Sequence, residues 1–145
     1  MNSSVERVAS DLVELRIPSR AEWVALARLG VAAVASRLRF SIEEIEDVKL
    51  AVAEACTAVI QHESHGEFIE LSCETSADSL RIRVRDAGRQ AAAANNGRSM
   101  DLEEARIAGL GVFLIRTLMD EVTYDVHPEL GTDLVMMKRL PGRPA

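Results

Sequence analysis

Long hydrophobic runs, aromatic residues and paired cysteines are all scarce in this sequence. Apolar runs such as Gly30 to Ala35 are far shorter than the ~18 residues that span a membrane. No secretory signal pattern follows Met1, so we expect a cytoplasmic protein with no membrane association. Cys56 and Cys73 lack metal-ligand spacing, and each lies in an apolar pattern typical of a buried reduced thiol. With aromatic residues at 3%, the core must consist mainly of Val, Leu, Ile and Ala.

Positive charge is also in deficit. The chain has 17 Lys and Arg against 23 Asp and Glu, a formal net charge of −6. This argues against nucleic acid as the main partner, because phosphate binding needs a basic surface. It leaves open plain solubility or a basic protein partner. The length of 145 residues predicts one domain, which we place at 12–140, between a flexible lead-in at 1–11 and a disordered tail at 141–145.

The periodicity of apolar residues predicts the order strand, helix, helix, strand, strand, loop, helix, strand, strand. The predicted segments are 12–17, 20–38, 42–62, 68–75, 80–85, 112–119, 122–126 and 134–137. Two antiparallel hairpins exclude a doubly wound parallel sheet. They predict an α/β (α+β) two-layer sandwich, with helices on one face of a mixed, mostly antiparallel sheet.

Capping residues predict where the first two helices begin. Ser19 is followed three residues later by Glu22, and Ser41 by Glu44. A serine and a glutamate at this spacing form a capping box, in which each side chain bonds a backbone N–H near the other residue. We therefore expect helices to begin just after Ser19 and just after Ser41.

The first hairpin has a predictable register. If Thr75 pairs with Leu80, Glu70 lies opposite Arg85, and Glu74 lies opposite the first arginine of the second strand, Arg81. The outer face of the sheet should then carry cross-strand ion pairs. The arginines are therefore interpreted as a solvated sheet face rather than an anion site.

Asp86 is the first candidate for chemistry. By alternation it points into the core with the apolar residues of its strand, where an unpaired carboxylate costs several kcal/mol. Gly88 follows and allows close backbone approach. A buried acceptor of this kind suits an amino group on a flat heterocycle. The alternative is a strand-ending turn that lets Asp86 rotate to solvent.

Two further features lie on predicted helices. Gly109-Leu110-Gly111 stands at a predicted helix start, where free N–H groups and the helix dipole favour phosphate, although a plain packing turn has the same pattern. Glu54 lies off the apolar stripe of its helix. It could activate an attacking hydroxyl, or it could be a surface glutamate.

Together these features resemble the ATP-binding fold shared by gyrase, sensor histidine kinases and the MutL repair protein, which is called the Bergerat fold. The closer resemblance is to the sigma-B and sigma-F type anti-sigma-factor serine kinases of bacteria, and it covers about Leu12 to Leu140. The segments that carry it are 35–57, 109–115, 118–122 and 131–132.

The resemblance implies roles for particular residues in binding ATP or ADP. Glu54 matches the general base, and Asp86 matches the acid that reads the adenine amino group, with Gly88 as its companion glycine. Gly109-Leu110-Gly111 matches the loop around the phosphates, and Thr132 matches a hydroxyl near the adenine end. The segment between Gly88 and Gly109 matches the mobile lid over ATP.

The resemblance also implies protein partners. Members of the family form homodimers, sequester an alternative sigma factor and phosphorylate a serine of a STAS-domain anti-anti-sigma partner. This is called partner switching. Arg28 falls near a position that contacts these partners.

One position departs from the family pattern. The motif is Glu, three residues, then Asn, but Ala58 stands where the Asn that holds Mg²⁺ is expected. A methyl group cannot coordinate Mg²⁺, although phosphates and waters could still hold the ion. Two functions therefore stay open: a protein-serine kinase that also binds sigma, and a non-kinase binding module that switches by partner competition or bound nucleotide. A detached sensor-kinase fragment is disfavoured by the match over 35–57.

Overall fold

The computed structural model describes residues 10–62, 66–87, 102–127 and 131–141, with backbone only for 102–108. The elements occur in the predicted order. They are β1 (Leu12–Pro18), the short 3-10 helix η1 (Ala21–Trp23), α2 (Val24–Ala35), α3 (Ile42–Gln61), β2 (Phe68–Thr75), β3 (Ser79–Ala87), α5 (Leu102–Leu118), β4 (Glu121–His127) and β5 (Gly131–Arg139).

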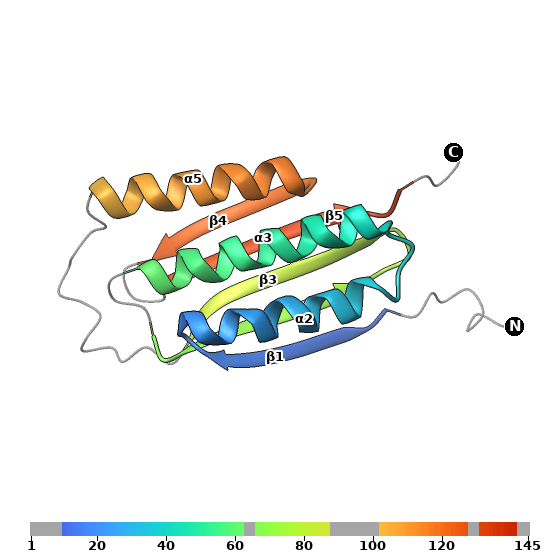
Figure 1. Cartoon of the computed structure of the whole chain (residues 1–145), viewed down its shortest axis with the longest axis horizontal. Helices are drawn as coiled ribbons and strands as arrows, with labels where there is room; N and C mark the ends of the chain where they lie inside the picture. The colour runs from blue at the N-terminus through green and yellow to red at the C-terminus, as the bar shows by residue number, and fades with distance from the viewer. Residues whose placement is uncertain (1–9, 63–65, 88–101, 128–130, 142–145) are drawn as a thin grey trace, which may run out of the picture.

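The molecule is a two-layer sandwich, as predicted. The five strands form one sheet in the order β1-β2-β3-β5-β4, and α2, α3 and α5 cover one of its faces (Figure 1). The sheet is not mixed, because all four strand pairings are antiparallel. β3 and β4 do run in the same direction, but β5 lies between them and pairs antiparallel with both.

The core between helices and sheet is aliphatic, as the composition predicts. Phe40 is its only aromatic member that is buried among the described residues. The predicted stripe of α3 is confirmed: Val48, Val52, Ala55 and Val59 have no exposed surface. Burial of such a stripe is what stabilises an amphipathic helix in a protein.

The cysteines belong to this core. Cys56 on α3 and Cys73 on β2 are buried and free. Burial raises the pKa of the Cys56 thiol to about 12 and that of Cys73 to about 11. Both remain protonated at neutral pH and are therefore unreactive. In the part of the chain that the structure describes, no helix is long and apolar enough to cross a bilayer.

The two predicted capping boxes have different outcomes. The Ser41 hydroxyl accepts from the Glu44 N–H at 3.0 Å, and the Ser41 N–H donates to Glu44 Oε1 at 2.8 Å, which confirms the second box. The first box is wrong. The Ser19 N–H instead donates to Glu67 O at 2.9 Å, which continues the β1–β2 pairing and turns the serine inward. The helical segment begins later, at η1, without a side-chain cap.

A pair of alanine substitutions tests this difference. We expect Ser41→Ala to lower the free energy of unfolding by about 1 kcal/mol, because it removes a helix cap. Ser19→Ala is the matched control, since its buried hydroxyl has no hydrogen-bond partner among the described residues. It should change stability by less than ~0.5 kcal/mol. Urea denaturation measures both, and equal losses would contradict the assignment of the caps.

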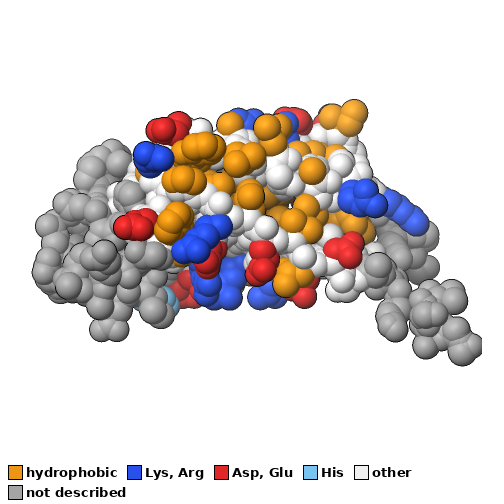
Figure 2. Space-filling model, turned by 90° about the horizontal axis from the view of Figure 1, so that it is seen from below, with side chains coloured by type: hydrophobic (Ala, Val, Ile, Leu, Met, Phe, Trp, Pro, Cys, Tyr) orange, Lys and Arg blue, Asp and Glu red, His pale blue; other side chains and the backbone are white. Residues whose placement is uncertain are grey.

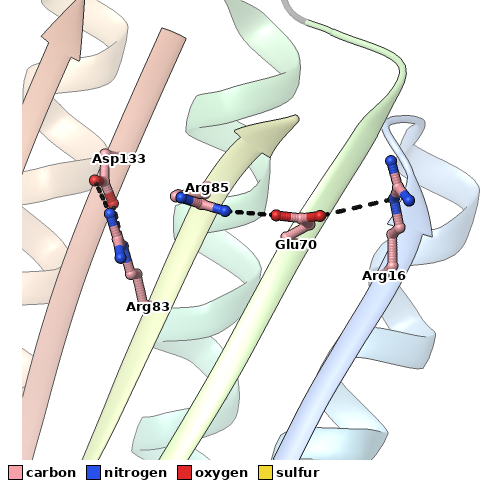
Figure 3. A network of polar contacts seen from close by, with 5 residues as sticks. All are labelled: Arg16, Glu70, Arg83, Arg85 and Asp133. Atoms are coloured by element: carbon pink, nitrogen blue, oxygen red, sulfur yellow. Dashed lines mark hydrogen bonds and ion pairs between the residues drawn. The ribbon is translucent and has the colours of Figure 1, made fainter. Parts of the chain in front are cut away.

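The outer face of the sheet carries one of the two predicted ion pairs, Glu70–Arg85, whereas no ion pair joins Glu74 and Arg81, which lie opposite each other as predicted. The register of the first hairpin is as expected, with Thr75 opposite Leu80 and Glu70 opposite Arg85. Figure 3 shows Glu70 between two arginines, 2.7 Å from Arg85 and 3.9 Å from Arg16. These pairs are exposed, so each contributes at most about 1 kcal/mol.

A second pair extends this charged face to β5. Arg83 bonds both carboxylate oxygens of Asp133, at 2.9 and 2.6 Å (Figure 3). The hydrogen bond from Arg83 holds the pKa of Asp133 below its ordinary value. Two of the three arginines of β3, Arg83 and Arg85, are therefore engaged with carboxylates, as expected of a solvated sheet face.

Candidate functional site

Asp86, near the end of β3, points into the molecule. The residue is only 6% exposed, so the alternative prediction, a carboxylate turned to solvent, is wrong. The backbone N–H of Gly66 donates to Asp86 Oδ1 at 2.7 Å. This bond orients the carboxylate and satisfies part of the cost of burying it. The result is an oriented acceptor at the end of a core strand.

The start of β5 lies against this carboxylate. Gly131 has φ +85, a conformation that favours glycine. A Cβ added there would lie 2.8 Å from Asp86 Cβ and 2.9 Å from Asp86 Cγ, which is too close for a side chain. Glycine at 131 therefore makes room for Asp86. Gly131 was not among the residues predicted for the site, although its place directly before Thr132 was a signal for it.

Thr132 completes the polar end of the sheet. The register pairs Arg85 with Asp133, and its continuation by one residue brings Asp86 opposite Thr132. Thr132 is 1% exposed, and its Oγ1 has no hydrogen-bond partner among the described residues. A buried hydroxyl without a partner costs free energy unless a ligand or water satisfies it. Together Asp86 and Thr132 fit a flat, polar heterocycle.

A second group of residues surrounds a cavity between α3 and α5. The cavity has a volume of about 280 Å³. Its lining residues are Glu54, Thr57, Ala58, Gln61, Leu110, Gly111 and Leu114. A Cβ added at Gly111 would lie 3.5 Å from Glu54 Oε1, so the glycine backbone passes close to this carboxylate. The structure thus brings Glu54 and Ala58 of α3 close to Leu110 and Gly111 of α5, which are far from them in the sequence.

The helix start predicted at Gly109 is wrong. α5 begins at Leu102 and runs through Gly109, Leu110 and Gly111 without interruption. Each glycine costs about 1 kcal/mol relative to alanine inside a helix. Burial of Val112 and Ile115 farther along α5 offsets this cost. N–H groups inside a helix are already paired, so the argument from a helix N-terminus does not apply to this conformation.

The two groups lie toward the same end of the molecule. The C-terminal end of α3, the end of β3 and the start of β5 meet there, on the left in Figure 1. α3 packs on both of these strands and on α5. An adenine end near Asp86 and a phosphate end near Glu54 are therefore compatible with one nucleotide.

Three sequence predictions are not part of this arrangement. Gly88 and residues 89–101 of the predicted lid between Gly88 and Gly109 lie outside the described residues, and residues 102–108 of that lid belong to α5. Arg28 is exposed on α2, and α3 lies between α2 and the cavity (Figure 1). The position of Arg28 therefore suits contact with another molecule rather than with a nucleotide.

The donor set of the cavity fits Mg²⁺. In the described ranges, no group of three His, Cys, Asp or Glu side chains could hold a metal by itself. However, three of the residues that line the cavity, Glu54, Thr57 and Gln61, have oxygen atoms in their side chains. Mg²⁺ prefers oxygen ligands and usually takes only one or two from protein, with phosphates and waters as the rest. The ion would be bound together with ATP phosphates.

Comparisons with known proteins place these features in a wider group. The family model of the histidine kinase-like ATPase domain matches residues 17–138. Serine-protein kinase RsbW of Halalkalibacterium halodurans is 36% identical over 139 residues, which cover 90% of this chain and 84% of the relative. The Listeria innocua protein of that name is 38% identical, with 88% and 87% covered. The Bacillus subtilis one is 34% identical, with 92% and 88% covered.

Proposed function

The chain belongs to the histidine kinase-like ATPase domain family, among its RsbW-type serine-protein kinases, and from this premise we propose its function. It is an anti-sigma factor of a bacterial partner-switching system. It binds ATP or ADP, sequesters an alternative sigma factor and phosphorylates a serine of a STAS-domain anti-anti-sigma protein. The unpaired thiols of Cys56 and Cys73 suit the reducing cytoplasm, where we place this activity.

The observation that carries the nucleotide-binding part of the proposal is the buried carboxylate of Asp86. Asp86 would accept a hydrogen bond from the adenine amino group, while the Gly66 N–H donates to its Oδ1. Thr132 would supply the hydroxyl beside the base, and Gly131 leaves the space that Asp86 occupies. Gly88 is the companion glycine in this proposal.

The phosphates would extend toward the cavity between α3 and α5. Glu54 would accept the proton of the attacking serine hydroxyl as the bond to the γ-phosphorus forms, with ADP as the leaving group. Gly109, Leu110 and Gly111 would surround the phosphates. Because these residues are helical here, this role requires the first part of α5 to change conformation when ATP binds. Mg²⁺, when bound, neutralises charge on the phosphates.

Three measurements on the purified protein test the function. We expect calorimetry to show ATP binding, a radiolabel assay to show phosphate transfer to a cognate STAS protein, and co-purification to show capture of a sigma factor. ATP binding and sigma capture without transfer would establish the alternative, a non-kinase binding module that reflects Ala58. Absence of ATP binding would contradict the proposal.

We extend the proposal to a homodimer joined at the free edge of β1. Among the described strands, β1 pairs only with β2, and it bears exposed apolar side chains, with Leu12 61% and Val13 44% exposed. Leu26 and Leu29 of α2 are also exposed. Figure 2 shows this side of the molecule, where hydrophobic side chains gather above a row of charged ones. A free strand edge is a template for pairing with another strand.

Backbone hydrogen bonds determine which groups of β1 face this edge. The N–H of Ser19 donates to Glu67 O at 2.9 Å. Since backbone groups alternate along a strand, odd-numbered residues bond β2, and Leu12, Glu14 and Arg16 direct their backbone groups outward. In an antiparallel pair of β1 strands, Glu14 can face either Arg16 or Glu14 of the second copy. Opposite charges attract, so we expect the register in which Glu14 faces Arg16 of the second copy. The twofold symmetry of the dimer produces this pair two times.

A charge exchange tests this register. Glu14→Arg or Arg16→Glu alone should weaken dimerisation roughly tenfold, because each places like charges opposite one another twice. The double variant should restore it. Asp125→Arg on the other edge strand, β4, is the control and should have no effect. Analytical ultracentrifugation measures the association, and a monomeric wild type or a double variant as weak as the single ones would contradict the proposed dimer.

A further inference from the structure

The cavity between α3 and α5 offers a substitute for the missing asparagine. We propose that the Gln61 carboxamide oxygen is the protein ligand of a divalent cation bound with the ATP phosphates, in place of the side chain absent at Ala58. The inference rests on the proposed nucleotide-binding function. It assigns the metal-dependent part of that function to a residue outside the family motif.

The position of Gln61 supports this assignment. It is three residues after Ala58 and seven after Glu54, so the three share one face of α3. All three line the cavity, opposite Leu110 and Gly111 of α5. The replacement at 58 and the glutamine at 61 therefore border the same space.

The direction of the side chain also fits. Cα–Cβ bonds of a helix tilt toward its N-terminus, so a long side chain covers the turn before its own position. A helical side chain at position 61 is therefore expected to extend over the turn that contains Ala58. Glutamine has one methylene more than asparagine, which extends its reach in that direction. With only a methyl group at 58, the space that an asparagine would fill is open to it.

The other oxygens on the cavity lining are committed to other tasks. The Thr57 hydroxyl donates to Ala53 O at 2.8 Å within the helix. Glu54 is the proposed base, and a base held on the cation would be less able to accept a proton. Gln61 is exposed, so it can turn without losing packing. A neutral carboxamide is also the same chemical group as the asparagine of the family motif.

Calorimetry of ATP binding with Mg²⁺ and with EDTA tests the proposal. We expect Mg²⁺ to tighten ATP binding to the wild type about tenfold or more, and Gln61→Ala to remove this gain. Affinity in EDTA should stay unchanged in Gln61→Ala. Ala58→Asn added to Gln61→Ala should restore the gain, because it returns the ligand of the family motif. Glu46→Ala, at an exposed position of α3, is the control and should behave as wild type.

A spectroscopic measurement gives an independent readout. Mn²⁺ added with ATP should broaden the side-chain amide signals of Gln61 in NMR spectra, and ATP with EDTA should not. A Gln61→Ala variant that keeps the full Mg²⁺ gain, a wild type without any gain, or an unbroadened Gln61 amide would each overturn the proposal. If the proposed nucleotide-binding function were itself wrong, ATP would not bind even in EDTA. This result is distinct from a loss of the Mg²⁺ gain alone.

Discussion

Asp86→Asn will weaken ATP binding roughly 100-fold, the loss that corresponds to ~3 kcal/mol for a hydrogen bond to a charged acceptor. The carboxylate is buried and oriented by the Gly66 N–H at 2.7 Å. Asparagine keeps one oxygen for Gly66 but presents an NH₂ group where the adenine amino group needs an acceptor. Calorimetry with ATP in EDTA measures this effect without any contribution from a metal.

The control for this variant is Asp133→Asn. Asp133 is on the outer face of the sheet and bonds Arg83, away from the proposed adenine position. We expect its ATP affinity to match the wild type. An Asp86→Asn variant that is folded, as judged by its circular dichroism, and still binds ATP normally would exclude Asp86 as the adenine acceptor.

The second large effect concerns phosphate transfer. Glu54→Gln should lower the transfer rate by about 10²–10⁴, the usual contribution of a general base. The neutral amide keeps the shape of the side chain on the cavity lining but cannot accept the serine proton. ATP affinity should change less than about threefold, since a base acts on the reacting hydroxyl rather than on the nucleotide. Single-turnover transfer to the STAS partner separates the two quantities.

Glu46→Gln is the matched control for the base. It removes one charge from the same helix at an exposed position that bonds only the nearby Lys49 among the described residues. Its transfer rate should equal that of the wild type. Equal losses in Glu46→Gln and Glu54→Gln would mean that the charge of α3, and not a base at 54, controls the reaction.

Local chemistry was enough to predict much of the fold. The Ser41–Glu44 capping box, the apolar stripe of α3 and the register of the β2–β3 hairpin all follow from spacings of a few residues. The inward direction of Asp86 followed from the period of two along β3. These features lie within one element or one hairpin, where backbone geometry alone relates sequence position to direction.

Contacts between distant segments could not be predicted in this way. Ser19 has the spacing of a cap, yet its N–H is bonded to Glu67 across the sheet. Gly109 and Gly111 have the pattern of a turn, yet packing of the later part of α5 maintains a helix through both. In each case tertiary contacts outweigh a local preference of about 1 kcal/mol.

The sequence by itself determined the element order, the two-layer class, the family resemblance and the candidate residues Glu54, Asp86 and Thr132. Only the tertiary structure decided which of these residues meet. It placed Gly131 against Asp86, inserted β5 between β3 and β4, and packed α5 against the face of α3 that carries Ala58 and Gln61. The physical reason is that spacing along the chain specifies direction within an element, whereas a site depends on how several elements pack together.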